Sequence, residues 1–484
     1  MAQDSLAELN AQDIAPGATS DLAAFASALR FDDIPAEVVS KVKELILDNI
    51  GVIFHGNQTP WAKMIAEMAT ESGATARSSI VGHGVKTSPA QAALVNATGG
   101  HSFEFDEIHR DGGFHPGSII LPVVLALAES EGGRTGQDFI TATVAAYEVG
   151  CRVGMSTGAG LFFRGHHPQG AVGPFAAATA AARILNLDAA ATAAARILNL
   201  DAADTQNAIG IAGSAAAGLM AAQEGSMVKR MHAGWAAQNG VYGGLLARKG
   251  FTGISNVLEA SFGGFLQTFS SGPLPENLQT NLGKTWETLN VGYKPYATVA
   301  SIQTALDCLR IIIQDHSLTS DDIEKIDIGC SKITYHHCAW AYKPAGVTAA
   351  QMNLFYSLAV LATDGDAGMG QFEQDRLQEP KLLGLISRME AHIDTEIEGM
   401  GRTFRHAARV NVRTKDGQQF EKTVLQRRGS PDNLAQPGDI EAKFNKLAGT
   451  VLSEGGVQNV QRLVEDLENA PSLDELFKVL RAKN

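Results

Sequence analysis

The sequence predicts a mainly α-helical protein, with a large all-helical domain and a smaller α+β domain. Three observations lead to this fold class: the length of 484 residues, the amino-acid composition and a change of hydrophobic pattern along the chain. A chain of this length usually divides between at least two hydrophobic cores. Hydrophobic residues make up 45% and aromatic residues only 6%, which favours closely packed helices over an aromatic-rich β sandwich.

The first part of the chain, up to about Leu289, has helical spacing nearly throughout. Apolar residues recur every three or four positions, and Gly or Pro marks the ends of the segments. The clearest predicted helices are 36–53, 116–130 and 137–154. We therefore assign residues 1–289 to the helical domain.

Strand patterns enter between about residues 320 and 426. Apolar residues at alternate positions predict strands at 326–330 and at 410–414. The second segment is followed by Asp416 and Gly417, a pair typical of a two-residue hairpin turn. These strands distinguish this part of the chain from the helical part before it.

Helical stretches such as 349–362 lie between the predicted strands. Residues 290–430 are therefore predicted to form the α+β domain. Residues 431–484 return to a helical pattern and are assigned to the helical domain again. Their amphipathic part, 440–480, is expected to pack back on the first part of the chain.

A tandem repeat interrupts the helical part. Residues 178–190 read ATAAARILNLDAA, and residues 191–203 repeat them without a change. In one unbroken helix, thirteen residues at about 100° each would rotate the second apolar stripe away from the first. Either one copy bulges or Asp188 begins a second helix, and an artefact of sequence assembly is an equally open explanation.

Composition excludes several classes of protein. The formal net charge of −13 disfavours nucleic acid and membrane partners. The four cysteines are too scattered for a disulfide framework or for a zinc or iron-sulfur site. The N-terminus has no basic region followed by an apolar run, and no stretch is apolar enough to span a membrane, so we expect a cytoplasmic protein.

The densest group of polar residues runs from His101 to Ser118. Glycines and a His-Pro pair place it in a loop that leads into an apolar helix. Loops on a rigid scaffold often carry catalytic groups, although a solvated acidic loop is an equally good interpretation. The histidines and acids could also ligate a metal, but their spacing matches no standard signature, so we expect no metal.

Three more segments carry histidines or lysines near apolar helices. They contain His166 and His167, then Lys229 with His232, and finally Lys294. Taken singly, each has a structural interpretation: an exposed capping loop, a snorkelling lysine and a surface linker lysine. Together with the polar loop they predict a cationic cleft for a small anionic substrate.

The same segments resemble the MmgE/PrpD family, which includes 2-methylcitrate dehydratase, cis-aconitate decarboxylase and iminodisuccinate epimerase. The resemblance covers nearly the whole chain. Its most specific pieces are EFDEIHRDGGFHPGSIILPVVLALAE, the GHHPQG loop, MVKRMHAGWAAQNGVYGGLLA and YKPYA. Further motifs, among them His337-Cys338-Ala-Trp340, are most similar to the fungal cis-aconitate decarboxylases of the family.

The resemblance implies a helical domain completed by the C-terminal segment, an α+β lid and a homodimer. It also assigns roles to residues that match the family motifs. Ile108, where animal decarboxylases have threonine, and Tyr342, a possible counterpart of a lid tyrosine, are assigned to substrate binding. The expected catalytic residues are Glu104, His115, His167, Lys229 and Lys294.

The expected function is that of a cofactor-independent lyase acting on a small di- or tricarboxylate. The leading hypothesis is decarboxylation of cis-aconitate to itaconate, in which lysines meet the developing negative charge and a histidine protonates carbon. A 2-methylcitrate dehydratase and a dicarboxylate epimerase are the enzymatic alternatives. A non-catalytic carboxylate-binding helical protein is the alternative from another class.

Overall fold

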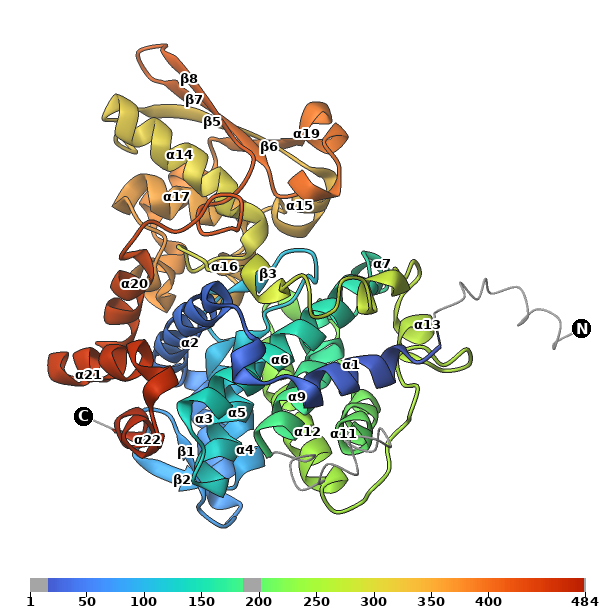
Figure 1. The fold of residues 1–484 in the computed structure, drawn as a ribbon. Helices are drawn as coiled ribbons and strands as arrows, with labels where there is room; N and C mark the ends of the chain where they lie inside the picture. The colour runs from blue at the N-terminus through green and yellow to red at the C-terminus, as the bar shows by residue number, and fades with distance from the viewer. Residues whose placement is uncertain (1–15, 186–201, 483–484) are drawn as a thin grey trace, which may run out of the picture.

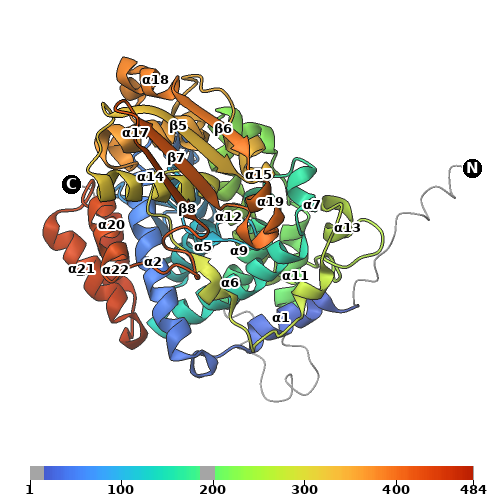
Figure 2. The same cartoon turned by 90° about the horizontal axis from the view of Figure 1, so that it is seen from above.

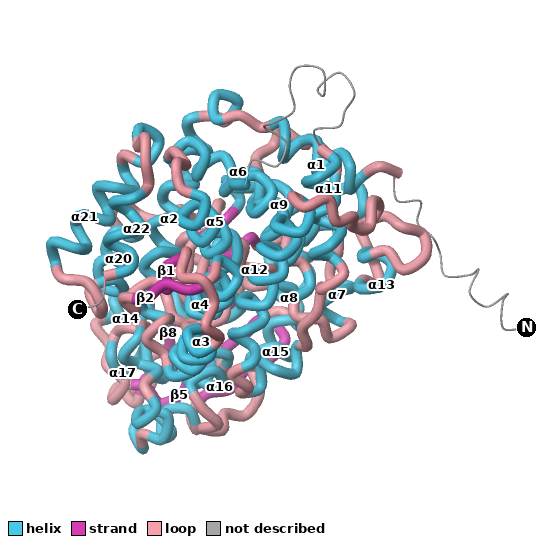
Figure 3. Tube along the Cα trace, turned by 90° about the horizontal axis from the view of Figure 1, so that it is seen from below, coloured by secondary structure: helices cyan, strands magenta, loops and turns pink. Residues whose placement is uncertain are grey.

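The computed structural model describes residues 16–185 and 202–482, and helices dominate this part of the chain (Figures 1 and 3). The prediction of a mainly helical protein is confirmed. All three clear helix predictions are confirmed as well, with ends shifted by at most a few residues. They are α2 (Ala36–Gly56), α5 (Gly117–Glu131) and α6 (Gly136–Ser156).

The centre of the helical part is a group of closely packed helices. Helix α12 (Val228–Ala247) packs against α4 (Pro89–Gly100) and α9 (Gly173–Leu185), and all three pack against α5 (Figure 3). Small residues permit this packing: a Cβ on Gly240 of α12 would overlap Ala177 of α9. Abundant alanine and glycine therefore bring helix backbones close together.

The prediction that residues 1–289 are all helical is wrong in detail. Strands β1 (Ser78–Ile80) and β2 (Val85–Thr87) form an antiparallel hairpin, and β3 (Ile108–His109) pairs with β4 (Val291–Gly292). Residues 251–289 hold only short helices such as α13 (Phe265–Phe269). Glycine and proline are frequent there, and both disfavour long helices.

The strands predicted after residue 320 are confirmed as part of a four-stranded sheet. Its order is β6-β5-β7-β8, with β5 parallel to β6 and antiparallel to β7. The predicted hairpin joins β7 to β8, and the turn contains Asp416 and Gly417. Strand β6 was not predicted. The strands are β5 (Ile323–Cys330), β6 (Met389–Ile393), β7 (Ala408–Thr414) and β8 (Gln419–Val424).

Helices α14 (Gln303–His316) and α17 (Leu354–Asp364) accompany this sheet and share its hydrophobic core (Figure 1). Alternate residues of β5 and β7, such as Ile326 and Val412, are fully buried in that core. The helical stretch predicted at 349–362 is confirmed, but it is divided into two helices, because Asn353 separates α16 (Val347–Met352) from α17. The Asn353 side chain accepts the N–H of Tyr356 and so caps α17.

The C-terminal segment packs back on the first part of the chain, as predicted. It forms α20 (Asp439–Ala448), α21 (Glu454–Glu465) and α22 (Asp474–Arg481), and α20 and α21 lie against α2 (Figure 1). Lys443 of α20 forms a buried ion pair with Asp48 of α2 at 2.7 Å. The same ammonium donates to the Phe105 carbonyl at 2.7 Å, so this segment supports the polar loop directly.

The remaining helices connect and cover these elements; seen from above, α15 and α19 lie close together beside the sheet (Figure 2). They are α1 (Ala18–Ala28), α3 (Pro60–Glu71), α7 (Gly160–Phe163), α8 (Pro168–Ala171), α11 (Ala203–Gly213), α15 (Lys332–Cys338), α18 (Pro380–Ile386) and α19 (Thr395–Gly399). Within the described residues, no helix has the length and apolarity needed to cross a membrane. The bulge or helix start predicted for the tandem repeat falls largely on residues outside the described ranges.

Candidate active site

The polar segment from His101 to Ser118 is a buried loop between α4 and α5. The loop prediction is confirmed, and the alternative of a solvated acidic loop is wrong, because Glu104 is 1% exposed and Asp106 is 0% exposed. Glu104 has a φ of 56°, a conformation that is uncommon for a residue with a side chain. Such local strain is found where a structure holds a residue for a function.

Glu104 is the centre of a buried ion cluster. Its Oε1 accepts from Lys229 and Arg230 at the start of α12, and its Oε2 lies 3.4 Å from Lys294 Nζ. Burial by itself would raise the pKa of Glu104, but Lys229, Lys294 and Arg230 hold it well below its usual range. Glu104 is therefore a permanent carboxylate that fixes the three cations.

Both predicted lysines are buried. The snorkelling interpretation of Lys229 and the surface-linker interpretation of Lys294 are therefore wrong. Burial lowers the pKa of Lys229 to about 8, although the contact with Glu104 raises it. Lys229 is thus mainly protonated at neutral pH and loses its charge in mildly alkaline solution.

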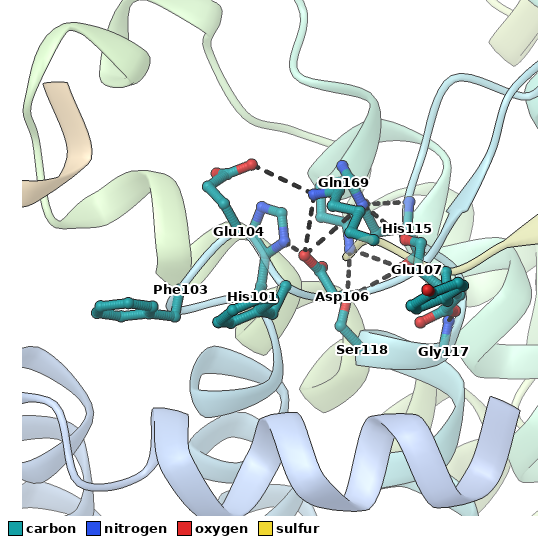
Figure 4. A network of polar contacts seen from close by, with 12 residues as sticks. His101, Phe103, Glu104, Asp106, Glu107, His115, Gly117, Ser118 and Gln169 are labelled. Carbon is teal, nitrogen blue, oxygen red and sulfur yellow. Dashed lines mark hydrogen bonds and ion pairs between the residues drawn. The ribbon is translucent and has the colours of Figure 1, made fainter. Parts of the chain in front are cut away.

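Asp106 links Lys294 to the histidines of the loop, and Figure 4 shows Asp106 beside His101 and His115. Its Oδ2 lies 2.6 Å from His101 Nδ1, and its Oδ1 lies 3.7 Å from His115 Nδ1 and 3.5 Å from Lys294 Nζ. Burial would raise the pKa of Asp106, but the two histidines and Lys294 hold it below its usual range. A second fixed carboxylate therefore lies beside the first.

His115 is held by hydrogen bonds on several sides. Its Nδ1–H donates to the Glu107 carbonyl at 2.7 Å, so Nε2 is the unprotonated nitrogen of the neutral ring. The Gln169 side chain accepts the His115 N–H at 2.9 Å and donates to its carbonyl at 2.8 Å (Figure 4). Burial lowers the pKa of His115 to about 3, despite nearby Asp106, so the ring is neutral at neutral pH.

Glu107 anchors the helix that follows His115. Its Oε1 accepts the Gly117 N–H at the start of α5 and the Tyr147 hydroxyl at 3.0 Å. Burial and the neighbouring carboxylates of Asp106 and Asp48 raise the pKa of Glu107 to about 7. A Cβ on Gly117 would overlap both Glu107 and Tyr147, so only glycine fits this position. The position of His115 thus depends on tight packing behind it.

His167 is the second imidazole of the site. It precedes α8, and its Nδ1 lies 2.8 Å from Nδ1 of His232, which comes from α12. Burial, followed by the charge of Lys229, lowers the pKa of His167 well below its usual range. Its ring centroid lies 5.7 Å from that of His101, which in turn lies 5.2 Å from that of His115. The imidazoles therefore form one continuous group.

A cavity of about 730 Å³ lies beside these groups and extends to the α+β part of the chain. Four of the five predicted catalytic residues line it: Glu104, His115, His167 and Lys229. The predicted binding residue Ile108 lines it as well. Residues that were grouped from the sequence alone thus lie around one cavity in the structure.

Two predicted residues do not line the cavity. Lys294 lies one layer deeper, in contact with Glu104 and Asp106. The Tyr342 hydroxyl donates to the Leu377 carbonyl at 3.0 Å, and its ring stacks on Tyr356. Tyr342 is therefore positioned within the second hydrophobic core and not on the cavity wall.

Sequence reasoning missed polar residues on the opposite wall. His337 of α15 lines the cavity, with Ser301 Oγ 3.2 Å from its Nδ1 and Gln223 Oε1 3.0 Å from its Nε2. Arg405, from the loop before β7, also lines the cavity. The His337 motif was noted as a resemblance, but nothing in the local sequence places it opposite Lys229. Across the described residues, no group of three or more His, Cys, Asp or Glu side chains is arranged to hold a metal ion.

Family comparison identifies the class of protein. The MmgE/PrpD N-terminal domain model matches residues 20–195 and 188–277, and the MmgE/PrpD C-terminal domain model matches residues 296–469. The two N-terminal matches overlap within the tandem repeat. Because the matches cover most of the chain, the protein belongs to the MmgE/PrpD family.

Similar proteins are found among fungal and animal enzymes. The cis-aconitate decarboxylase-like protein oryM of Aspergillus oryzae is 32% identical over 96% of this chain and 97% of its own length. The cis-aconitate decarboxylase of Aspergillus terreus is 30% identical, with 96% of each chain covered. The human cis-aconitate decarboxylase is 24% identical over 96% of this chain and 94% of its own length. This similarity supports a lyase of the family.

Proposed function

We propose that this protein is a cofactor-independent lyase that decarboxylates cis-aconitate to itaconate. The observation that carries the proposal is the meeting of Lys229, His115 and His167 at one cavity beside a fixed Glu104. An anion that enters the cavity finds an ammonium group and two imidazoles. The choice of cis-aconitate as substrate is supported by the similarity to cis-aconitate decarboxylases.

Lys229 is the residue that meets the developing charge. Decarboxylation breaks a carbon–carbon bond, releases carbon dioxide and leaves an electron pair delocalised toward a neighbouring carboxylate. A preorganised cation in a cavity with little water stabilises such charge by several kcal/mol, on the order of about 3. Lys294 acts from the layer behind, where it balances Glu104 and Asp106.

The histidines supply the proton that completes itaconate: as carbon dioxide leaves, the double bond shifts to the carbon that carried it, and the proton adds to the carbon at the other end of the allylic system. Burial keeps the pKa of His115 near 3 and that of His167 well below its usual range. The carboxylates of a bound substrate raise both values, because they stabilise the imidazolium. Substrate binding thereby charges the proton donor where it is needed, and the proton then moves to carbon as carbon dioxide departs.

The region around the four-stranded sheet is proposed to act as a lid, within the division 1–289, 290–430 and 431–484. Support comes from the cavity wall, which combines residues such as Lys229 from the first part with His337 and Arg405 from the second. A homodimer is proposed too, because Trp235 and Tyr242 of α12 are 41% and 46% exposed. Light scattering coupled to size exclusion tests the homodimer.

The test of the function is product analysis. The purified protein is incubated separately with cis-aconitate, 2-methylcitrate, citrate and iminodisuccinate, and products are followed by NMR. Itaconate and carbon dioxide from cis-aconitate are expected. Loss of water from 2-methylcitrate without decarboxylation would instead identify a dehydratase, and isomerisation of iminodisuccinate would identify an epimerase. Absence of turnover with all four would contradict the lyase proposal.

A further inference from the structure

The deep cluster has little positive charge to spare for a substrate with several carboxylates. Lys229, Arg230 and Lys294 face Glu104 and Asp106, so three cations meet two carboxylates. The surrounding histidines His101, His115 and His167 are neutral because burial lowers the pKa of each. A tricarboxylate therefore brings more negative charge than this end of the cavity balances.

Three further cations line the same cavity on its α+β wall: Lys332 of α15, with Arg402 and Arg405 from the loop between α19 and β7. Within residues 16–185 and 202–482, no ion pair joins the Lys332 or Arg402 side chain to a carboxylate. Their charges are thus available to a ligand. Glu398, a carboxylate on this wall, accepts the backbone N–H of Lys332 at 2.8 Å.

Arg405 is the best fixed of the three cations. Its guanidinium donates to the Arg110 carbonyl and, at 3.2 Å, to the Arg402 carbonyl. The nearest carboxylate, Asp111, is 3.8 Å away and makes two 3.2 Å contacts with Arg110 instead. Carbonyl groups orient an arginine without cancelling its charge, so Arg405 is held in place but incompletely neutralised.

Arg405 also lies next to the reacting part of the site. The carbonyl that it contacts belongs to the loop that leads through Gly112 and Gly113 to His115, and both glycines line the cavity. Lys229, His115 and Arg405 therefore line the same cavity, and one elongated anion can contact all three.

We propose that Arg405, assisted by Arg402 and Lys332, binds a substrate carboxylate remote from the one held by Lys229, which makes the site selective for tricarboxylates. This inference rests on the proposed function only in taking the ligand to be a polycarboxylate. A planar guanidinium matches a carboxylate in geometry as well as in charge. The binding role does not require that decarboxylation be the reaction.

The test compares a tricarboxylate with a dicarboxylate that lacks the remote group. Tricarballylate and glutarate are titrated by calorimetry into the wild-type protein and into Arg405→Gln, Arg405→Lys and Arg402→Gln. Arg413→Gln is the matched control, since Arg413 is an exposed arginine on β7 that pairs with Glu324 at 2.9 Å. Melting temperatures verify that each variant is folded, and Arg402, which is exposed, provides a variant that preserves packing.

Arg405→Gln is expected to weaken tricarballylate binding at least about tenfold and glutarate binding less than about threefold. Arg405→Lys should fall between, and Arg413→Gln should bind as the wild type does. With cis-aconitate, KM should rise more than kcat falls. Equal weakening of both ligands would overturn the inference, and so would no change for tricarballylate. Arg405-dependent tricarballylate binding without itaconate formation would uphold the inference and reject the proposed reaction.

Discussion

The cations of the site form two groups, and the groups differ in how their charges are balanced. Lys229 and Arg230 lie deep and share the permanent carboxylate of Glu104. Arg402 and Arg405, on the α+β wall, are held mainly by carbonyl groups. A fully buried charge needs a fixed partner for the protein to fold, whereas a charge with access to water can await the ligand. The deep group is therefore suited to chemistry and the outer group to recognition.

Lys229→Ala tests the deep group most directly. Turnover is expected to fall by roughly 10³-fold, since the removed cation is the one proposed to meet the developing charge. Glu104 keeps Arg230 and Lys294, so the melting temperature should fall only modestly. Steady-state kinetics and thermal unfolding provide the two readouts, with exposed Lys249→Ala as control. Wholesale unfolding would instead assign Lys229 a structural role.

Glu104→Gln sharpens the comparison through pH. Lys229 has a pKa of about 8, because burial lowers it while Glu104 raises it. Without the carboxylate this pKa should drop further, so the cation is lost at lower pH. The wild type should lose kcat as pH rises through about 8, and the variant should lose it at a lower pH, with roughly 10²-fold less activity at its optimum. Coincident pH profiles would refute this coupling.

Gly117→Ala tests how tightly the deep group is packed. The added methyl overlaps Glu107 and Tyr147, which should destabilise the fold by about 1–3 kcal/mol and reduce kcat by displacing His115. Gly384→Ala in α18 is the control, because nothing lies within 4 Å of its Cβ position. Thermal unfolding of the two variants should move in opposite directions. Equal melting temperatures would show that the loop adapts.

Ionic strength should affect the outer cations more than the deep ones, and this is the smallest of the predicted effects. Salt screens charges that are open to solvent more than buried ones, so KM for the substrate should rise several-fold between low and about 0.5 M salt while kcat changes little. Arg402→Gln should flatten this dependence, since Arg402 is exposed at the cavity. If kcat fell with increasing salt by as large a factor as KM rises, the division into two groups would be contradicted.

Much of the architecture was predictable because it depends on local pattern. The helices α2, α5 and α6 follow apolar residues spaced for one helical face, and the β7–β8 hairpin follows alternation and an Asp-Gly turn. The failures also have local reasons. Asn353 looks like a helical residue in a periodic stretch, but its side chain caps a new helix and divides the segment.

The site was predictable in part, because motifs name residue types and not their surroundings. Glu104, His115, His167 and Lys229 all line the cavity, whereas Tyr342 packs in a core. The sequence around Tyr342 does not indicate the direction in which its side chain points, so its packing against Tyr356 could not be predicted. The positions of His337 and Arg405 at the cavity were not predicted, because residues that they contact, such as Gln223 and Arg110, are far away in the sequence.

The order of residues by itself determined that helices would dominate, where most of them lie and which side chains are candidates for the proposed chemistry. Those properties arise from periodicity and residue type, which act over a few neighbouring positions. Only the tertiary structure decided that Lys229 is buried against Glu104 and that Arg405 reaches the loop before His115. Charge balance and the pKa of a buried group depend on neighbours that folding brings together from distant parts of the chain.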